Sequence, residues 1–161
     1  MIFLVFIALF GCKKQNSPVV TLTSTPTGCP LNSICSFTYY NSSDVSNTFQ
    51  VTSGGYRVFA YQSIDSAICD ATTTVYFKIS PDVTSFDITS AQIASGQSAF
   101  YGFTCPCCDY LAQTIVGGEI KGKMTDNYQW LVNAKIILGA KNTTLRDTLV
   151  FNQYFHPPYS L

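Results

Sequence analysis

The stretch 130-WLVNAKIIL-138 has the alternation of a β-strand that buries one of its two faces. Successive side chains of a strand point to opposite faces of a sheet. The residues that share the apolar face are Trp130, Val132, Ala134, Ile136 and Leu138. Asn133 and Lys135 lie on the other face. The pattern predicts a strand over Gln129–Leu138 with one face in a hydrophobic core.

The neighbouring stretches predict a strand on each side of this one. Leu111–Lys123 precedes it through the turn Thr125-Asp126-Asn127, and Thr148–Phe155 follows it after Gly139–Arg146. Gly117-Gly118 interrupts the first of these strands, which predicts a bulge or a close approach of two backbones. The last third of the chain is therefore expected to form three consecutive strands.

The earlier part of the chain predicts further short strands, rich in β-branched and aromatic residues. They are Val19–Leu22 as an edge strand, Ile34–Tyr40, Thr48–Thr52, Tyr56–Tyr61, Thr72–Ile79 and Gln97–Thr104. Ser53-Gly54-Gly55 is a tight-turn signal, so the strands on either side of it are expected to pair as a hairpin.

One stretch, Ser85–Ser95, is expected to hold the single helical piece. Thr89 or Ser90 would cap it, and Gly96 would end it. Short strands at this spacing with almost no helix predict an all-β fold. We expect an antiparallel β-sandwich of about eight strands, immunoglobulin-like or similar, with one short helix and disulfides.

The composition fits a packed domain with few charges. Hydrophobic residues make up 47% of the chain and charged residues 11%, against roughly 25% charged in an average soluble domain. Basic and acidic residues balance at nine each. No basic patch is available to neutralise phosphates, so nucleic acid is not expected as a partner.

The pattern of the first residues predicts a targeting signal. Ile2–Phe10 is an unbroken apolar run, too short for a membrane-spanning helix of roughly 20 residues but of the length of a signal-peptide core. Leu9-Phe10-Gly11-Cys12 resembles the lipobox of bacterial lipoproteins. The resemblance implies that 1–11 is a cleaved signal peptide and that Cys12 becomes the lipidated, palmitate-bearing N-terminus, which holds the chain to a membrane.

The domain organisation and location follow from that resemblance. Residues 12–25 are expected to be the lipidated N-terminus and a flexible tether, and residues 26–161 the β-sandwich domain. Residue 13 is Lys, not the Asp that resembles an inner-membrane retention signal. The expected location is the outer membrane of a bacterial cell envelope, with the periplasmic and surface faces both open.

The cysteines predict a disulfide framework. Of the seven in the chain, Cys12 is assigned to lipid, and the candidates for disulfides are Cys29, Cys35, Cys69, Cys105, Cys107 and Cys108. Export places them where disulfides persist. One of Cys105, Cys107 and Cys108 could join Cys69, with the others joining Cys29 and Cys35 or one another. Alternatively, Cys29 and Cys35 could close their own loop. Adjacent Cys107 and Cys108 point to different sides of an extended chain and are expected to have different partners.

An alternative interpretation gives the cluster a chemical role. Three thiols at Cys105, Cys107 and Cys108 could bind a soft metal such as Cu(I) or Zn²⁺. Cys105 and Cys108 also have Cys-x-x-Cys spacing, which suits thiol–disulfide exchange. A zinc site normally takes four ligands, and the only histidine, His156, lies far off in a Pro-rich tail. The structural interpretation is favoured, with no metal and no cofactor.

The chain has no recognisable catalytic motif, and no catalytic residue is assigned. Its only glutamate, Glu119, is followed by Lys121 and Lys123 at strand spacing, which predicts a surface ion pair. Asp65-Ser66-Ala67 and Asp147-Thr148-Leu149 resemble a bacterial O-glycosylation sequon, with Ser66 and Thr148 as acceptors and a plain turn as the alternative for the first.

Tyrosines are the remaining candidates for binding. Those singled out are Tyr39, Tyr40, Tyr56, Tyr61, Tyr101, Tyr110, Tyr128, Tyr154 and Tyr159. A tyrosine-lined surface would suit a protein or glycan partner, although strand alternation puts most of them in or near the core. We therefore expect a non-catalytic, outer-membrane-anchored lipoprotein that binds or scaffolds an envelope component. The alternative is a periplasmic thiol-redox or soft-metal-handling protein.

Overall fold

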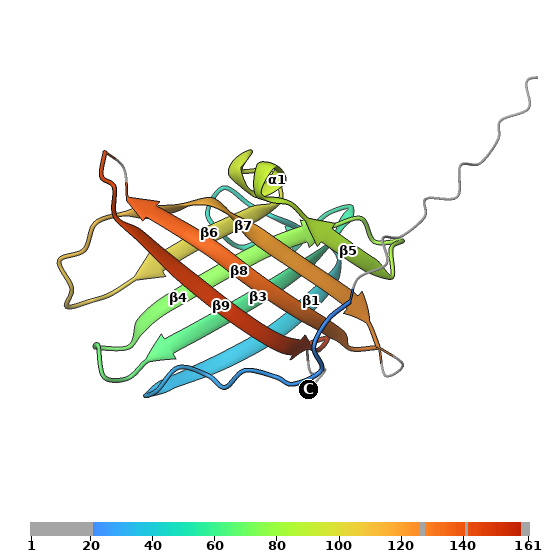
Figure 1. Cartoon of the computed structure of the whole chain (residues 1–161), viewed down its shortest axis with the longest axis horizontal. Helices are drawn as coiled ribbons and strands as arrows, with labels where there is room; N and C mark the ends of the chain where they lie inside the picture. Colours follow the sequence, from blue (N-terminus) through green and yellow to red (C-terminus); the bar gives the residue numbers. More distant parts are fainter. Residues whose placement is uncertain (1–20, 126–127, 141, 159–161) are drawn as a thin grey trace, which may run out of the picture.

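The chain forms a β-sandwich. Its structure, a computed structural model, describes residues 21–125, 128–140 and 142–158. The proposed signal peptide, Cys12 and Tyr159 lie outside these residues. The described part contains two antiparallel sheets of five and four strands packed face to face, one short helix and three disulfides (Figure 1). The predicted all-β sandwich is confirmed, with nine strands in place of about eight.

The two sheets divide the chain unevenly. The five-stranded sheet has the order β2-β1-β3-β4-β6 and contains β1 (Ser33–Val45), β2 (Val51–Ser53), β3 (Tyr56–Asp65), β4 (Ala71–Ile79) and β6 (Ala99–Thr104). The four-stranded sheet has the order β5-β7-β8-β9 and contains β5 (Ser85–Ile88), β7 (Gln113–Met124), β8 (Trp130–Ala140) and β9 (Arg146–Phe155). The helix is α1 (Ser90–Ala94). None of the helical structure in the described residues is long and apolar enough to cross a bilayer.

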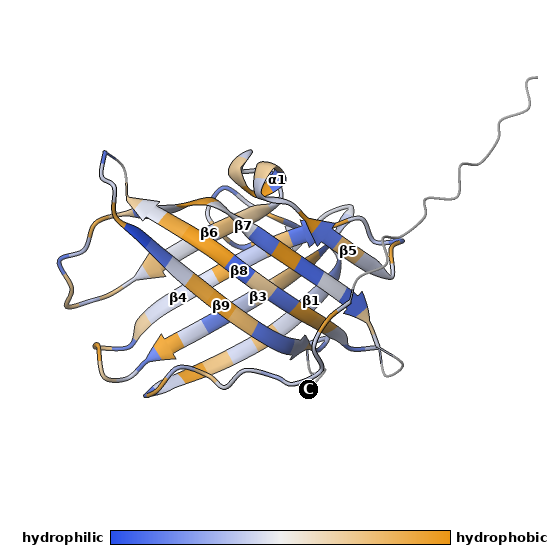
Figure 2. Ribbon diagram, in the orientation of Figure 1, coloured by the Kyte–Doolittle hydropathy of each residue, from blue (hydrophilic) through white to orange (hydrophobic). Residues whose placement is uncertain are grey.

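The core lies between the sheets and is largely aromatic. Trp130 of β8 is fully buried and packs edge-on against Phe59 of β3, with ring centroids 5.4 Å apart. Phe59 in turn stacks on Phe77 of β4 at 4.8 Å. Lys135, on the opposite face of β8, is exposed, as its alternation predicts. Figure 2 shows hydrophobic and hydrophilic positions following one another along the strands. The predicted core face of the opening stretch is confirmed.

One seam between the sheets is closed by the last residues of the domain. The Tyr39 N–H donates to the His156 carbonyl oxygen at 2.8 Å, and the His156 N–H donates to the Phe37 carbonyl oxygen at 3.1 Å. Residues 23–27 cover the rest of the β9 edge, where the Thr27 N–H donates to the Asn152 carbonyl oxygen at 2.9 Å. Covering an edge strand in this way protects it from pairing with other chains.

Two predicted elements near the ends of the sheets differ from the structure. Thr21 and Leu22 lie outside any strand, so the described half of the predicted Val19–Leu22 edge strand is wrong. Ser85–Ile88 forms β5 and not helix, because Phe86 and Ile88 alternate with polar residues and are buried against the core. The helix begins at Ser90, where Thr89 caps it in a capping box with Gln92, as predicted for the cap.

The predicted hairpin around Ser53-Gly54-Gly55 is also wrong. β2 pairs with the end of β1, with Ser43 opposite Ser53, because β1 continues through a bulge between Tyr40 and Ser43. We call residues 43–53 the flap. The flap turns back over the outer face of the five-stranded sheet, where Lys78 Nζ of β4 lies 2.7 Å from Asp44 Oδ1.

The bulge predicted at Gly117-Gly118 is confirmed. The register of β7 against β8 shifts between Ile115 and Gly117. Gly118 has a φ of +128°, and a Cβ added there would lie 2.1 Å from the Lys135 carbonyl oxygen. Only glycine permits this approach of the two backbones.

Candidate functional site

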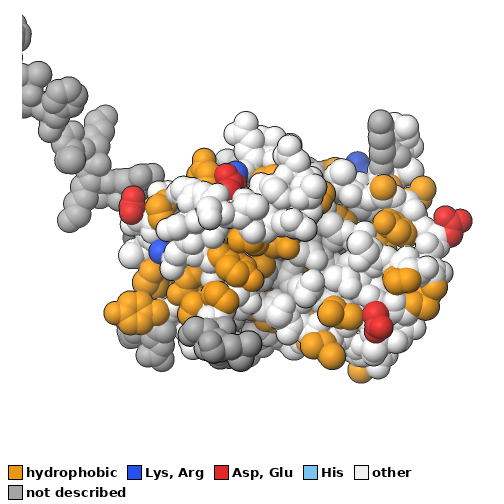
Figure 3. Space-filling view, turned by 180° about the vertical axis from the view of Figure 1, so that it is seen from behind, with side chains coloured by type: hydrophobic (Ala, Val, Ile, Leu, Met, Phe, Trp, Pro, Cys, Tyr) orange, Lys and Arg blue, Asp and Glu red, His pale blue; other side chains and the backbone are white. Residues whose placement is uncertain are grey.

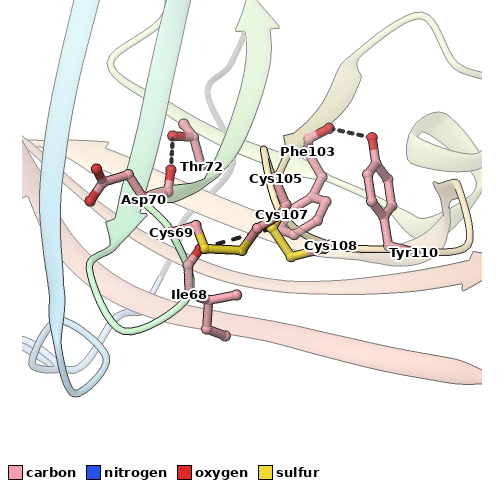
Figure 4. Close-up of a disulfide and its surroundings, with 9 residues drawn as sticks. All are labelled: Ile68, Cys69, Asp70, Thr72, Phe103, Cys105, Cys107, Cys108 and Tyr110. Atoms are coloured by element: carbon pink, nitrogen blue, oxygen red, sulfur yellow. Dashed lines mark hydrogen bonds between the residues drawn. A yellow bond between two sulfur atoms is a disulfide. The ribbon is translucent and has the colours of Figure 1, made fainter.

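Two disulfides meet at one end of the sandwich. Cys69–Cys107 joins the β3–β4 turn to the segment that follows β6, and Cys105–Cys108 closes a loop within that segment (Figure 4). We call residues 105–112 the cystine loop. Cys107 and Cys108 have different partners, as expected from their alternation. The third disulfide, Cys29–Cys35, closes its own loop, which is one of the alternatives left open by the sequence.

The three sulfurs that could hold a metal do lie together. The Sγ atoms of Cys105, Cys107 and Cys108 are all within 4.8 Å of one another. Each of them is bonded to another sulfur, and the thiolate is the form that binds metals and attacks disulfides. His156 is held in the β1–β9 seam by its backbone. In this structure the cluster is therefore a pair of covalent links, and its chemistry would require prior reduction.

The disulfides fix the position of an aromatic side chain. The Tyr110 hydroxyl donates to the Phe103 carbonyl oxygen at 3.1 Å, and the two rings pack edge to face with centroids 4.8 Å apart. On the other side of the Cys69–Cys107 bond, the Thr72 hydroxyl donates to the Asp70 carbonyl oxygen at 3.0 Å. The start of β4, the end of β6 and the cystine loop are thus linked into one unit (Figure 4).

A cleft of about 470 Å³ lies beside this unit, on the outer side of β4 and β6. Thr72, Thr74 and Tyr76 line it from β4, and Tyr101–Thr104 line it from β6. The cystine loop and the start of β7 contribute a wall from Tyr110 to Thr114, and Thr48 and Phe49 of the flap form the opposite wall. We call this hollow the aromatic cleft.

The aromatic cleft is uncharged. None of the described side chains that line it carries a charge, and the lining includes three tyrosines, two phenylalanines and five threonines. Burial raises the pKa of Tyr76 and of Tyr101, and the nearby Tyr40 and Asp147 raise these values further. Both hydroxyls are therefore neutral hydrogen-bond donors at physiological pH. In Figure 3, which shows the molecule from the side of the five-stranded sheet, apolar side chains are spread over the face with few charged ones among them.

A second hollow, of about 660 Å³, lies between β4 and β5 and is more polar. Its charged groups already have partners. Lys78 pairs with Asp44, and Asp87 lies 3.7 Å from Lys121 Nζ. Lys78 Nζ also lies 4.5 Å from the centre of the Tyr56 ring. These side chains are occupied by the fold, so the aromatic cleft is the better candidate for a binding site.

The remaining predicted residues lie on the surface or in the core. Lys121 Nζ is 2.6 Å from Glu119 Oε1, which confirms the predicted ion pair for that lysine. Ser66 and Thr148, the glycosylation candidates, are both exposed. Ser66 lies in a turn in which Asp65 Oδ1 accepts from the Ala67 N–H at 2.8 Å.

Most of the tyrosines are in or near the core, as predicted. Tyr39 and Tyr61 are buried, and Tyr40, Tyr101 and Tyr154 are half-buried. Among the tyrosines that the structure describes, the exposed ones are Tyr56, Tyr110 and Tyr128. Neither Tyr76 nor the aromatic cleft was predictable from local pattern, since the parts of the cleft come from four separate segments.

Comparison with known proteins adds no further assignment. No protein-family model matches the chain, and no curated protein or solved structure matches it significantly.

Proposed function

We propose that this chain is a non-catalytic lipoprotein of the bacterial cell envelope. It is held at the outer membrane by an acylated Cys12, and its β-sandwich binds another envelope component. The observation that carries the proposal is the pairing of the cysteines. Three disulfides use every cysteine of the chain except Cys12, so no other cysteine is left to pair with it.

The arrangement of the charged groups supports binding over catalysis. Hydrolytic and transfer chemistry usually needs an acid or base placed beside a substrate cavity. In the described part of the chain, Asp44 pairs with Lys78, and Glu119 and Asp87 surround Lys121. The aromatic cleft is instead lined by neutral groups suited to holding a ligand.

Mass spectrometry of the chain purified from bacterial membranes tests the anchor. The expected product begins at Cys12 and carries the added mass of a diacylglyceryl group and an N-linked acyl chain, since two or more chains are needed for stable attachment. Cys12→Ser should move the protein out of the membrane fraction. The control is the double variant Cys29→Ser, Cys35→Ser, which should stay membrane-bound. A wild-type chain that retains residues 1–11 and has no acyl mass would contradict the proposal.

The alternative function, in thiol redox or soft-metal handling, is favoured by one observation, the closeness of the three sulfurs in the cystine loop. Titration of the oxidatively folded protein with a thiol reagent, with and without denaturant, separates the two functions. A structural framework gives no reactive thiol besides any from Cys12. A reactive thiol pair, or retention of Cu(I) by the folded protein, would support the alternative.

A further inference from the structure

We propose that the aromatic cleft is a binding site for a neutral carbohydrate chain. This inference rests on the proposed function, because it names the class of envelope component that the domain holds. It is carried by the chemistry of the lining, by the rigidity of the walls and by a blocked strand edge next to the cleft.

The lining matches the two kinds of surface on a sugar. A pyranose ring has an apolar C–H face, which packs on aromatic rings, and a rim of hydroxyls, which both donate and accept hydrogen bonds. Tyr76 and Tyr110 offer rings with polar tips, while Thr72 and Thr74 offer hydroxyls of the same dual character. Tyr101 lies opposite Val75 and points to the core side of the sheet, so its ring supports the floor of the cleft from below. Because no lining side chain is charged, the site favours an uncharged glycan over a uronic acid or a sulfated chain.

The size and rigidity of the cleft suit a preformed site. Its volume of about 470 Å³ lies within the roughly 300–1,000 Å³ of small-molecule sites. The floor consists of paired strands, with Thr74 directly opposite Gly102. The Tyr110 wall is held by its hydrogen bond to Phe103 and by the two disulfides of the cystine loop. Little side-chain freedom remains to be lost when a ligand binds, which favours affinity.

The adjacent strand edge argues against an extended peptide as the ligand. β6 is the last strand of its sheet, and such an edge can accept an added strand. Here the Tyr110 hydroxyl already occupies the Phe103 carbonyl oxygen at that edge. A peptide strand would have to displace Tyr110, whereas a sugar can pack on the Tyr110 ring in its present position.

Gly102 provides a direct test of the site. A Cβ added at Gly102 meets no atom within 4 Å, and its φ is not in the left-handed region, so Gly102→Val adds its methyl groups to the cleft without a clash. Valine also suits a strand better than glycine does. Gly28 is the matched control, because a Cβ there also meets nothing within 4 Å and Gly28 is remote from the cleft lining.

The experiment is calorimetric titration of the full chain, kept in a detergent without a sugar headgroup. The neutral probes are maltohexaose, cellohexaose and chitohexaose, and the comparison probes are a polygalacturonate oligomer and a proline-rich decapeptide. We expect at least one neutral probe to bind. Gly102→Val should weaken that binding at least 10-fold without lowering the melting temperature, and Gly28→Val should leave the binding unchanged.

Three results would overturn the carbohydrate proposal. These are no binding of any neutral probe, equal binding by wild type and Gly102→Val, and preference for the peptide or the anionic oligomer. If Gly102→Val fails to fold, Tyr110→Ala replaces it, since the ring is 47% exposed and its loss opens the wall without opening the core. None of these results changes the acyl mass or the membrane fractionation, so failure of the carbohydrate site is distinguishable from failure of the lipoprotein assignment.

Discussion

Lys78 of β4 and Asp44 of the flap form an ion pair of 2.7 Å across the outer face of the five-stranded sheet. The pair fixes the flap just after the bulge of β1 between Tyr40 and Ser43. The Val45 N–H donates to the same Asp44 oxygen at 2.7 Å. The flap carries Thr48 and Phe49 to the edge of the aromatic cleft, so this contact helps to set the width of the cleft.

Acid should weaken the contact between the flap and the sheet. The hydrogen bonds from Lys78 and Val45 lower the pKa of Asp44 below its ordinary value. Stability from this group is present above the unfolded pKa and is lost as pH falls through the lower folded pKa. Asp44→Asn should cost about 0.5 kcal/mol near neutral pH, the range of a partly exposed pair, and should flatten the acid limb of the stability profile. Urea unfolding between pH 2 and pH 7 measures both, and an unchanged acid limb in Asp44→Asn would contradict the role of the pair.

Alkaline pH should also destabilise the domain. Burial raises the pKa of Tyr61, Tyr76 and Tyr101. The unfolded chain loses these protons first, near the ordinary tyrosine value of about 10, so the free energy of unfolding falls as pH rises from there through the folded values. Urea midpoints between pH 8 and pH 11.5 test this. Tyr76→Phe should reduce the decline, whereas Tyr128→Phe, at a site 77% exposed, should not.

Cys69–Cys107 should contribute more to stability than Cys29–Cys35, because it closes a longer loop. Cys69–Cys107 spans 38 residues and Cys29–Cys35 spans six. The loss of loop entropy in the unfolded chain predicts a stabilisation of about 4 kcal/mol for the first bond and about 2 kcal/mol for the second. Paired alanine substitutions at each bond, followed by chemical unfolding, measure these losses. Equal losses would show that constraint of the unfolded chain is not the dominant effect.

The Cys69–Cys107 pair should also matter for the cleft. Removal of this bond frees the cystine loop and with it Tyr110, so binding of a neutral oligosaccharide should fall more than in the Cys29–Cys35 pair variant.

Gly118 should be among the least replaceable residues of β7. A Cβ there would meet the Lys135 carbonyl oxygen at 2.1 Å, and the φ of +128° is strained for any other residue. Gly118→Ala should therefore cost more than about 2 kcal/mol. Gly28→Ala, at an open position, should change the stability by less than about 0.5 kcal/mol. Thermal unfolding of the two variants gives the comparison, and similar melting temperatures would contradict it.

The parts of the fold that sequence reasoning predicted are those in which local pattern and tertiary structure agree. The alternation from Trp130 to Leu138 and the paired glycines at 117 and 118 are each read from adjacent residues. β5 is hard to predict because Ser85–Ile88 supplies only two apolar residues, Phe86 and Ile88. The helix cap at Thr89 follows it directly, so the strand and the helix have the appearance of one helical stretch. Pairing of β2 with β1 depends on a bulge after Tyr40. The polar run at 41–44 gives this second half of β1 the appearance of a loop.

The candidate site was less predictable for a geometric reason. The aromatic cleft combines residues of the flap, of β4, of β6 and of the cystine loop. Its walls are brought together by the Asp44–Lys78 pair and by Cys69–Cys107, which are contacts between distant residues. Six cysteines allow fifteen pairings, and no feature of the sequence selects among them. Tyrosine abundance indicated a binding surface but not its place.

The closure of the β1–β9 seam also sets the order in which the domain can fold. Thr27 and Asn152 are 125 residues apart, and the backbone of His156 pairs with β1 on the other side of the sandwich. Neither contact exists until β9 has been made, and closing such long loops is slow because their entropy must first be lost. A chain that has not yet formed the end of β9 leaves the backbone of Phe37 and Tyr39 without its partner at His156. A chain truncated before Asn152 should therefore remain unfolded, because it lacks the buried Phe155 and the backbone contacts that close the seam.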